Sequence, residues 1–207
     1  MATYLSFVVT SLLLALTPGP DVLLVVTIAA KEGFNKAFQL TLGLASGVIF
    51  HTTLIILGIS ALIIASPAAM KLIASFGAGY LLYLAWLTWH HRHDDMTVNR
   101  QAKIKGGYYW RGVIMNISNP KVLLFFLALF PQFAQLDEPG YHLRIALLGL
   151  TFILVTVLVF GSLAFLMAKS TQNLIQNHRF KYVMDYVAIT IFVLLAGLLL
   201  YSVFAHS

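Results

Sequence analysis

Long runs of apolar residues, separated by short polar segments, dominate the 207-residue chain. A helix needs about 20 mostly apolar residues to cross the roughly 30 Å hydrocarbon core of a bilayer. Six runs reach this length, and no segment between them is long enough to form a soluble domain. We therefore predict one all-α integral membrane domain over residues 1–207, with six transmembrane helices. Their approximate bounds are Tyr4 to Ala30, Phe38 to Ala65, Pro67 to Trp89, Gly112 to Phe133, Leu143 to Met167 and Tyr182 to Phe204.

The first and the fourth runs each contain residues that interrupt a helix. Proline has no backbone N–H, so it leaves a carbonyl of the preceding turn without its donor, and inside a bilayer that carbonyl needs protein or water as a partner. We expect both breaks to face the protein interior, with Gly19 and Asn119 as N-caps and Pro20 and Pro120 at the first helical positions. The residues at the breaks are Thr17, Pro18, Gly19, Pro20 and Asp21 in the first run and Asn119, Pro120 and Lys121 in the fourth.

The two breaks also mark an internal repeat. Residues 20–24 read Pro-Asp-Val-Leu-Leu and residues 120–124 read Pro-Lys-Val-Leu-Leu, and each copy lies in the first helix of a group of three. Because three is odd, the second group must be inverted in the membrane relative to the first, as in many secondary transporters. The prediction is a first repeat at about 4–89, a cytoplasmic loop at about 90–111 and a second repeat at about 112–204.

Composition and charge agree with this membrane topology. Hydrophobic residues make up 60% of the chain and charged residues only 10%, against about 25% charged in ordinary soluble domains. Ten of the 13 lysines and arginines fall in three alternate loops, so the positive-inside rule places these loops in the cytoplasm and both termini outside. The net charge of +6 is therefore a topology signal that anionic lipid can reinforce, and it gives no reason to expect a nucleic acid partner.

Two opposite charges are predicted at the middle of the membrane. Asp21 and Lys121 each lie nine residues from the cytoplasmic end of their run, which is about 14 Å along a helix. An unpaired charge at this depth costs at least about 2.5–3.5 kcal/mol, so we expect the two side chains to pair or to line a wet cavity. The helix dipole at the N-terminal position of Lys121 favours a nearby anion, either Asp21 or a substrate carboxylate. A purely architectural ion pair between the two helices remains the alternative.

Further polar residues accompany these charges. Asn116 and Asn119 add amides beside Lys121, and Thr17 adds a hydroxyl beside Asp21, so the group has the chemistry to hold a zwitterion. Tyr80 in the third run is a candidate for lining the path of the substrate, with a role as an interfacial anchor as the alternative.

The second run carries an ionisable residue and two glycines at intervals of four. His51 has an ordinary pKa near neutrality, so it is a candidate for proton coupling together with Asp21. A structural hydrogen-bonding role is the alternative. Gly43 and Gly47 share the face of His51, and small residues at this spacing let transmembrane helices approach closely.

Several classes of chemistry are not supported by the sequence. There is no cysteine, which excludes disulfides and thiolate metal sites. The apolar runs contain no nucleophile or metal-ligand motif, so an integral-membrane hydrolase using Asp21 and His51 is only a rival hypothesis. A cluster of histidines and aspartates at one membrane edge, over residues 90–95, is better explained as a solvated loop than as a metal site. We expect no catalytic residue, no metal and no cofactor.

In these motifs the chain resembles the LysE/RhtB family of bacterial amino-acid exporters. The combination is specific, although each element alone is not. The matching segments are Thr17-Pro18-Gly19-Pro20-Asp21, Gly43-x3-Gly47-x3-His51, Gly77-Ala78-Gly79-Tyr80-Leu81-Leu82-Tyr83-Leu84, Asn116-x2-Asn119-Pro120-Lys121 and Phe130-Pro131-Gln132-Phe133. The resemblance implies a multi-pass protein of the bacterial inner membrane that moves amino acids or their derivatives outward, driven by the proton gradient. The His51 and Phe130–Phe133 features look closest to the branch that handles homoserine, its lactone and other neutral amino acids.

The sequence therefore predicts a secondary transporter that exports neutral amino acids or derivatives of the homoserine or threonine type by proton antiport. Its termini are expected in the periplasm, and one repeat is expected to rock against the other around the midplane charges. Export of another small metabolite or of a cation is the alternative within transporters. The sequence leaves the exact substrate, the coupling ion and the choice between monomer and homodimer open.

Overall fold

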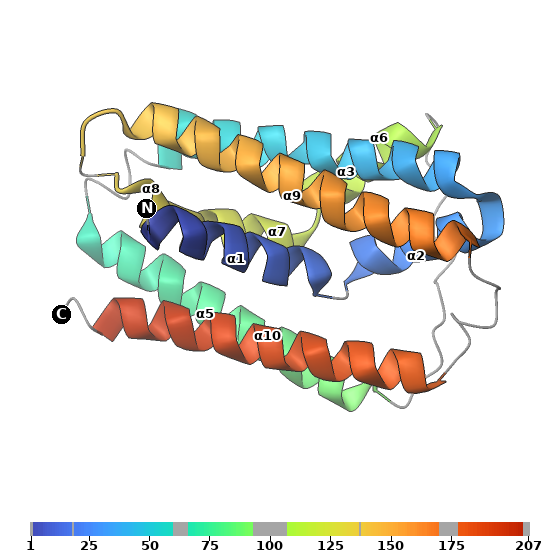
Figure 1. Ribbon diagram of the computed structural model, residues 1–207. Coiled ribbons are helices and arrows are strands. Elements are labelled where there is room, and N and C mark those ends of the chain that lie inside the picture. The colour runs from blue at the N-terminus through green and yellow to red at the C-terminus, as the bar shows by residue number, and fades with distance from the viewer. Residues whose placement is uncertain are drawn as a thin grey trace.

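The computed structural model describes residues 2–17, 19–59, 66–92, 107–136, 138–169 and 178–204, and every regular element in these ranges is helical (Figure 1). Pro18 and most of the predicted cytoplasmic loop, residues 93–106, lie outside the described residues. The elements are α1 (Ala2–Leu16), α2 (Pro20–Glu32), α3 (Phe34–Leu54), η1 (Ile55–Ile59), α5 (Pro67–His90), α6 (Gly107–Ile117), α7 (Pro120–Leu124), η2 (Phe125–Leu129), α8 (Phe130–Ala134), α9 (Tyr141–Lys169) and α10 (His178–Phe204).

Four segments of the described chain are long and apolar enough to cross a membrane unbroken. Two bent pairs add two more spans when each pair is counted as one. In the first pair, α1 and α2 meet at 60°, and in the second, α6 meets the segment Pro120–Ala134 at 48°. The prediction of a helical membrane protein whose first and fourth segments are interrupted is confirmed. The unbroken spans are Phe34–Leu57, Lys71–His90, Tyr141–Lys169 and Tyr182–Tyr201.

Two details of the helices differ from the sequence prediction. Helix α6 begins at Gly107 rather than at Gly112, because Arg111 lies inside the helix instead of ending the preceding loop. The segment before Arg111 is aromatic, and such residues suit the membrane interface as well as a helix. The elements η1 and η2 are single π-helical turns, for which the apolar runs around them give no sequence signal.

The helices form a bundle in which the two broken segments lie at the centre (Figure 1). Helix α3 packs along α6 and α9, while α5 packs along α10 on the opposite side, next to η2. In Figure 1, α1 and α7 lie between these two sides, and both chain ends are at the same end of the bundle. The segment from α6 to α8 runs opposite to the segment from α1 to α2, which is the arrangement that inverted repeats require.

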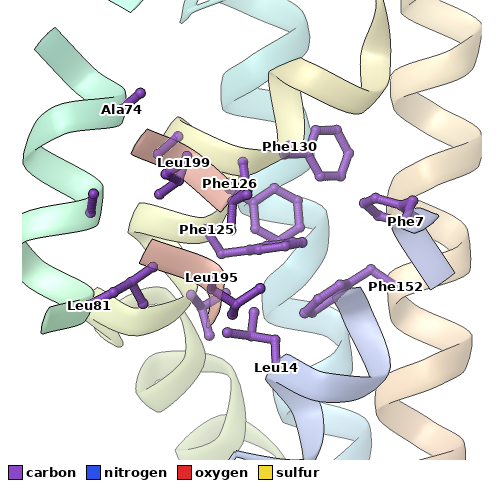
Figure 2. Packing of buried hydrophobic residues seen from close by; sticks show 14 of the residues in the cluster. Phe7, Leu14, Ala74, Leu81, Phe125, Phe126, Phe130, Phe152, Leu195 and Leu199 are labelled. Atoms are coloured by element: carbon purple, nitrogen blue, oxygen red, sulfur yellow. The ribbon is translucent and has the colours of Figure 1, made fainter. Parts of the chain in front are cut away.

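A cluster of phenylalanine rings holds the centre of the bundle together (Figure 2). The rings of Phe126 and Phe130 stack with centroids 4.7 Å apart, and Phe125 stacks on Phe152 of α9 at 5.1 Å. Phe7 of α1 meets Phe130 edge to face at 5.5 Å. The cluster thereby joins α1, the second broken segment and α9.

The glycines of α3 form the tightest helix contact with α6. A Cβ atom added to Gly43 would lie 1.9 Å from the carbonyl oxygen of Tyr109, and one added to Gly112 would lie 2.3 Å from the carbonyl oxygen of Leu40. A Cβ atom on Gly47 would lie 2.7 Å from the side chain of Asn116. The two backbones are in direct contact, as the spacing of Gly43 and Gly47 predicts.

We expect Gly43→Ala to destabilise the protein by about 1–3 kcal/mol, because the added methyl group must push α3 and α6 apart. Gly79→Ala in α5 is the matched control, since a Cβ atom there meets nothing within 4 Å. That substitution should leave stability unchanged or raise it by up to about 1 kcal/mol, because alanine favours helix more than glycine does. Equilibrium unfolding in mixed detergent micelles measures both changes. Equal stability of the two variants would contradict the packing described here.

Candidate functional site

The N-termini of two half-helices meet at the centre of the bundle. Helix α2 begins at Pro20 with Gly19 as its N-cap in an extended conformation (φ −145°, ψ −178°). Helix α7 begins at Pro120 with Asn119 as its N-cap, and the side-chain oxygen Oδ1 of Asn119 accepts a hydrogen bond of 3.0 Å from the backbone N–H of Lys121. Both caps and both prolines occupy the positions that the sequence predicts, with a proline where the missing N–H costs nothing.

Asp21 and Lys121 form a buried ion pair between these two helix ends. The ammonium nitrogen Nζ of Lys121 lies 3.3 Å from Oδ2 and 3.4 Å from Oδ1 of Asp21. The two side chains are 4% and 5% exposed, respectively. The sequence leaves two arrangements open for these charges, a direct ion pair or a shared wet cavity. The structure contains the direct ion pair. The pair joins residues 100 positions apart and links the first broken segment to the second.

Two backbone carbonyls of the first broken segment complete the surroundings of Lys121. Its Nζ donates to the carbonyl oxygen of Thr17 at 3.1 Å and to that of Leu14 at 3.4 Å. In an unbroken helix the Leu14 carbonyl would receive the N–H of residue 18, but proline has none. Thr17 follows the last residue of α1, and its carbonyl is likewise turned to the lysine. These contacts offset part of the cost of burying the ammonium group.

Gly19 keeps the space around the ion pair open. A Cβ atom at this position would lie 2.6 Å from Oδ1 of Asp21 and 3.1 Å from Nζ of Lys121. Any other residue would therefore require the Asp21 carboxylate to shift. The hydroxyl of Thr17 donates to the carbonyl oxygen of Leu13 at 2.6 Å, and the carbonyl oxygen of Thr17 accepts from Lys121, so Thr17 contributes its backbone to the site.

Several polar atoms beside the ion pair are buried without a protein partner. They are the side-chain oxygen of Asn116, the side-chain nitrogen of Asn119 and Nδ1 of His51. The carbonyl oxygen of Asn116 accepts from the backbone N–H of Asn119 at 3.0 Å and lies 3.3 Å from Nε2 of His51, which donates to it in the tautomer protonated there. His51 is 1% exposed, and its ring stacks on Phe126 with centroids 5.4 Å apart.

A small cavity lies directly against the ion pair. Its volume is about 10 Å³, about what one water molecule requires. An amino acid does not fit into a space of this size. The lining residues are Leu14, Ala15, Asp21, Asn116, Lys121, Val122, Phe152, Thr156 and Phe160.

Helix α9 contributes Phe152, Thr156 and Phe160 to this lining, and the sequence interpretation did not include them. They recur every fourth residue, so they share one helix face. The one available signal is Thr156, a polar residue at the centre of an apolar run. That signal is weak, because its hydroxyl donates to the Phe152 carbonyl of its own helix at 2.8 Å, as threonines in many membrane helices do.

The structure brings most of the predicted site residues together. Asp21, Lys121 and Asn116 line the cavity. Thr17, Gly19, Pro20, Asn119 and Pro120 form the two helix ends beside it, and His51 is linked to it through the Asn116 carbonyl. Tyr80 lies on α5 with its ring centroid 6.0 Å from that of Tyr83, and it is not among the residues that line the cavity. Pro18 lies outside the described residues.

Comparison with known proteins identifies related sequences. Residues 12–203 match the family model described as LysE type translocator. A homoserine/homoserine lactone efflux protein of Salmonella typhi is 30% identical over 157 residues, which cover 75% of this chain and 76% of the relative. An uncharacterised membrane protein of Vibrio cholerae is 28% identical over the same shares of both chains. The uncharacterised membrane protein YrhP of Bacillus subtilis is 31% identical over 66% of this chain and 70% of its own length. No solved structure shows a significant match.

We expect Asp21→Asn and Lys121→Met each to destabilise the protein by about 3–5 kcal/mol, because each leaves the partner charge buried without a counter-ion. The double variant removes both charges, so its loss of stability should be well below the sum of the two single losses. Unfolding in mixed detergent micelles of the wild type and the three variants gives this comparison. Additive losses would show that the two charges do not stabilise one another.

Proposed function

The chain belongs to the LysE type translocator family, a family of transporters rather than enzymes, and from this premise we propose that it exports neutral amino acids or their derivatives across the bacterial inner membrane. The observation that carries the proposal is the buried pair of Asp21 and Lys121 between two interrupted helices. A membrane scaffold has no need of buried opposite charges at two helix breaks, whereas a carrier of zwitterions does.

The chemistry of the site suits an amino acid. A carboxylate on Asp21 attracts an ammonium group, and an ammonium on Lys121 attracts a carboxylate. The N-terminus of α2 adds a positive field for an anion. At the start of α7, the N–H of Lys121 is already bonded to the side chain of Asn119. The unpartnered side-chain atoms of Asn116 and Asn119 are available for further polar groups of the substrate. In the proposed loaded state, Asp21 and the freed carbonyls hold the substrate ammonium, and Lys121 and the helix ends hold its carboxylate.

Substrates of the homoserine or threonine type are favoured by the relatives. Two Salmonella proteins at 30% identity are named homoserine/homoserine lactone efflux proteins. We propose that the carrier works by antiport with protons, in which substrate and proton compete for the pair of Asp21 and Lys121. Asp21 is the first candidate for the proton site. His51 is the second, because its Nδ1 is buried without a partner and its Nε2 contacts the Asn116 carbonyl beside the cavity.

Transport requires the site to open alternately to the two sides of the membrane. Asp21 belongs to the first three-helix group and Lys121 to the second, so the ion pair lies where the groups meet. Rocking of one group against the other changes the separation of the two charges and makes room for the substrate. The contact between α3 and α6 also joins the two groups and provides a tight surface about which this movement can occur.

We expect Asp21→Asn and Lys121→Met each to reduce export by at least about tenfold, because each removes one of the charges that distinguish a bound zwitterion. The measurement is efflux of labelled threonine or homoserine from cells that express each variant at wild-type levels, together with resistance to toxic analogues of these amino acids. Lys169→Met is the matched control. This lysine is exposed at the end of α9, where it lies over the ring of Phe165, and the control should export normally.

Wild-type export by well-expressed Asp21→Asn and Lys121→Met variants would remove the pair from the transport mechanism. Absence of export of either amino acid by the wild type would instead overturn the proposed substrate class.

The proposed orientation places both termini in the periplasm and the three basic loops in the cytoplasm. The two ends of the chain lie at the same end of the bundle (Figure 1). Because the chain has no cysteine, single cysteines report this orientation without background. A cysteine at Ala2 should react with a membrane-impermeant maleimide in intact cells, and one at Met96 should react only after the membrane is opened. The reverse pattern would invert the proposed topology and the direction of transport inferred from it.

A further inference from the structure

The contacts of Lys121 define a binding site for a primary ammonium group. Its Nζ contacts three acceptors, which are the carboxylate of Asp21 and the carbonyl oxygens of Leu14 and Thr17, at 3.1 to 3.4 Å. A primary ammonium has three N–H donors, so these acceptors match it in number. We call this set of three acceptors the ammonium cage.

The cage and its occupant come from different parts of the chain. All three acceptors belong to the first broken segment, between the end of α1 and the start of α2. The ammonium reaches them from α7, which belongs to the second broken segment. The first broken segment therefore forms a binding site for R–NH3⁺ groups. The second broken segment occupies this site with the side-chain ammonium of Lys121.

We propose that Lys121 is an internal substitute for the ammonium group of the transported solute, and that the solute enters the site by displacing it from the ammonium cage. The inference rests on the proposed function, because it assumes that the ion pair is the transport site. The inference adds that the site first recognises a primary ammonium group of the solute. It follows that a solute needs no free carboxylate to enter the site.

The surroundings of the cage support exchange of one ammonium for another. The adjoining cavity has a volume of about 10 Å³, so the cage cannot hold Lys121 and a solute ammonium together. Asn116 lines this cavity, is 4% exposed and has no partner for its side-chain oxygen. The side chain of Asn116 is therefore a candidate acceptor for polar groups that accompany the incoming ammonium. Gly19 leaves no side chain between the cage and the lysine.

Occupation by Lys121 lowers the apparent affinity for any competing ammonium. When a site is available for only a fraction of the time, the apparent dissociation constant rises by the inverse of that fraction. Removing the lysine ammonium abolishes this competition. A Lys121→Met variant should therefore bind a carboxylate-free ammonium solute more tightly, although it exports less, because no internal ammonium remains to expel the solute.

Threoninamide and 3-hydroxybutyrate separate the two recognition modes, because the first has the ammonium of threonine without its carboxylate and the second has a carboxylate without the ammonium. Binding of labelled threoninamide to purified protein in detergent should be about tenfold tighter in Lys121→Met than in the wild type. Asp21→Asn should weaken it by about tenfold or more, since the charged acceptor is lost. Lys169→Met, the exposed control, should bind as the wild type does.

Unchanged or weaker threoninamide binding by Lys121→Met would overturn the inference. A measurement on the wild type alone provides a second test that does not depend on how well this variant folds. Threoninamide should displace labelled threonine, and 3-hydroxybutyrate should not. Displacement by 3-hydroxybutyrate but not by threoninamide would show that Lys121 receives a carboxylate and that the cage is not the entry site. Failure of any ammonium solute to bind either form would also overturn it.

The outcome is separable from that of the proposed function. Ammonium-dependent binding without efflux of threonine or homoserine would support the ammonium cage and reject the proposed transport function. Efflux by the wild type, combined with weaker threoninamide binding by Lys121→Met, would support the transport function and reject the ammonium cage.

Discussion

The architecture depends on one interaction, the ion pair that Asp21 and Lys121 form inside a bundle whose outer surface is apolar. Charges at this depth are tolerated only when their surroundings replace water almost completely. Pro18 helps to provide that replacement, because it deprives the Leu14 carbonyl of its helical N–H donor. This oxygen and the carbonyl oxygen of Thr17, which follows α1, face the ammonium of Lys121. The breaks in the helices are thus part of the solvation of the charges.

The same pair lies where the two three-helix groups would separate in the proposed transport cycle. Its carboxylate belongs to the first three-helix group and its ammonium to the second, while the glycine contact of α3 with α6 and the ring cluster around Phe126 hold the groups together nearby. Packed helices shift between discrete arrangements rather than deforming continuously. A pocket too small for an amino acid, next to an ion pair, is therefore what we expect of the proposed carrier between its two open states.

Strong local signals explain what the sequence could predict. Few structures accommodate a proline next to an N-cap residue, or a charge within an apolar run. The residues alone therefore predicted the two helix breaks and their caps. They also predicted that Asp21 and Lys121 either pair directly or line a shared wet cavity. The sequence interpretation begins α6 too late, because an arginine beside an apolar run indicates a loop, whereas Arg111 lies inside a helix whose first turn is aromatic. The π-helical turns η1 and η2 had no signal in their apolar sequence. The lining from α9 was not predicted, because Thr156 bonds within its own helix and resembles any other membrane threonine.

We propose that the ion pair is the transport site as well as a contact between helices. Transport by the charge-free double variant Asp21→Asn/Lys121→Met, reconstituted in vesicles with a pH gradient, tests this most directly, because the variant loses the charges without leaving one of them unpaired. The account predicts a folded protein, with thermal stability close to that of the wild type, that shows no gradient-driven transport of threonine or homoserine. Transport at the wild-type rate would contradict the account and assign the pair a structural role.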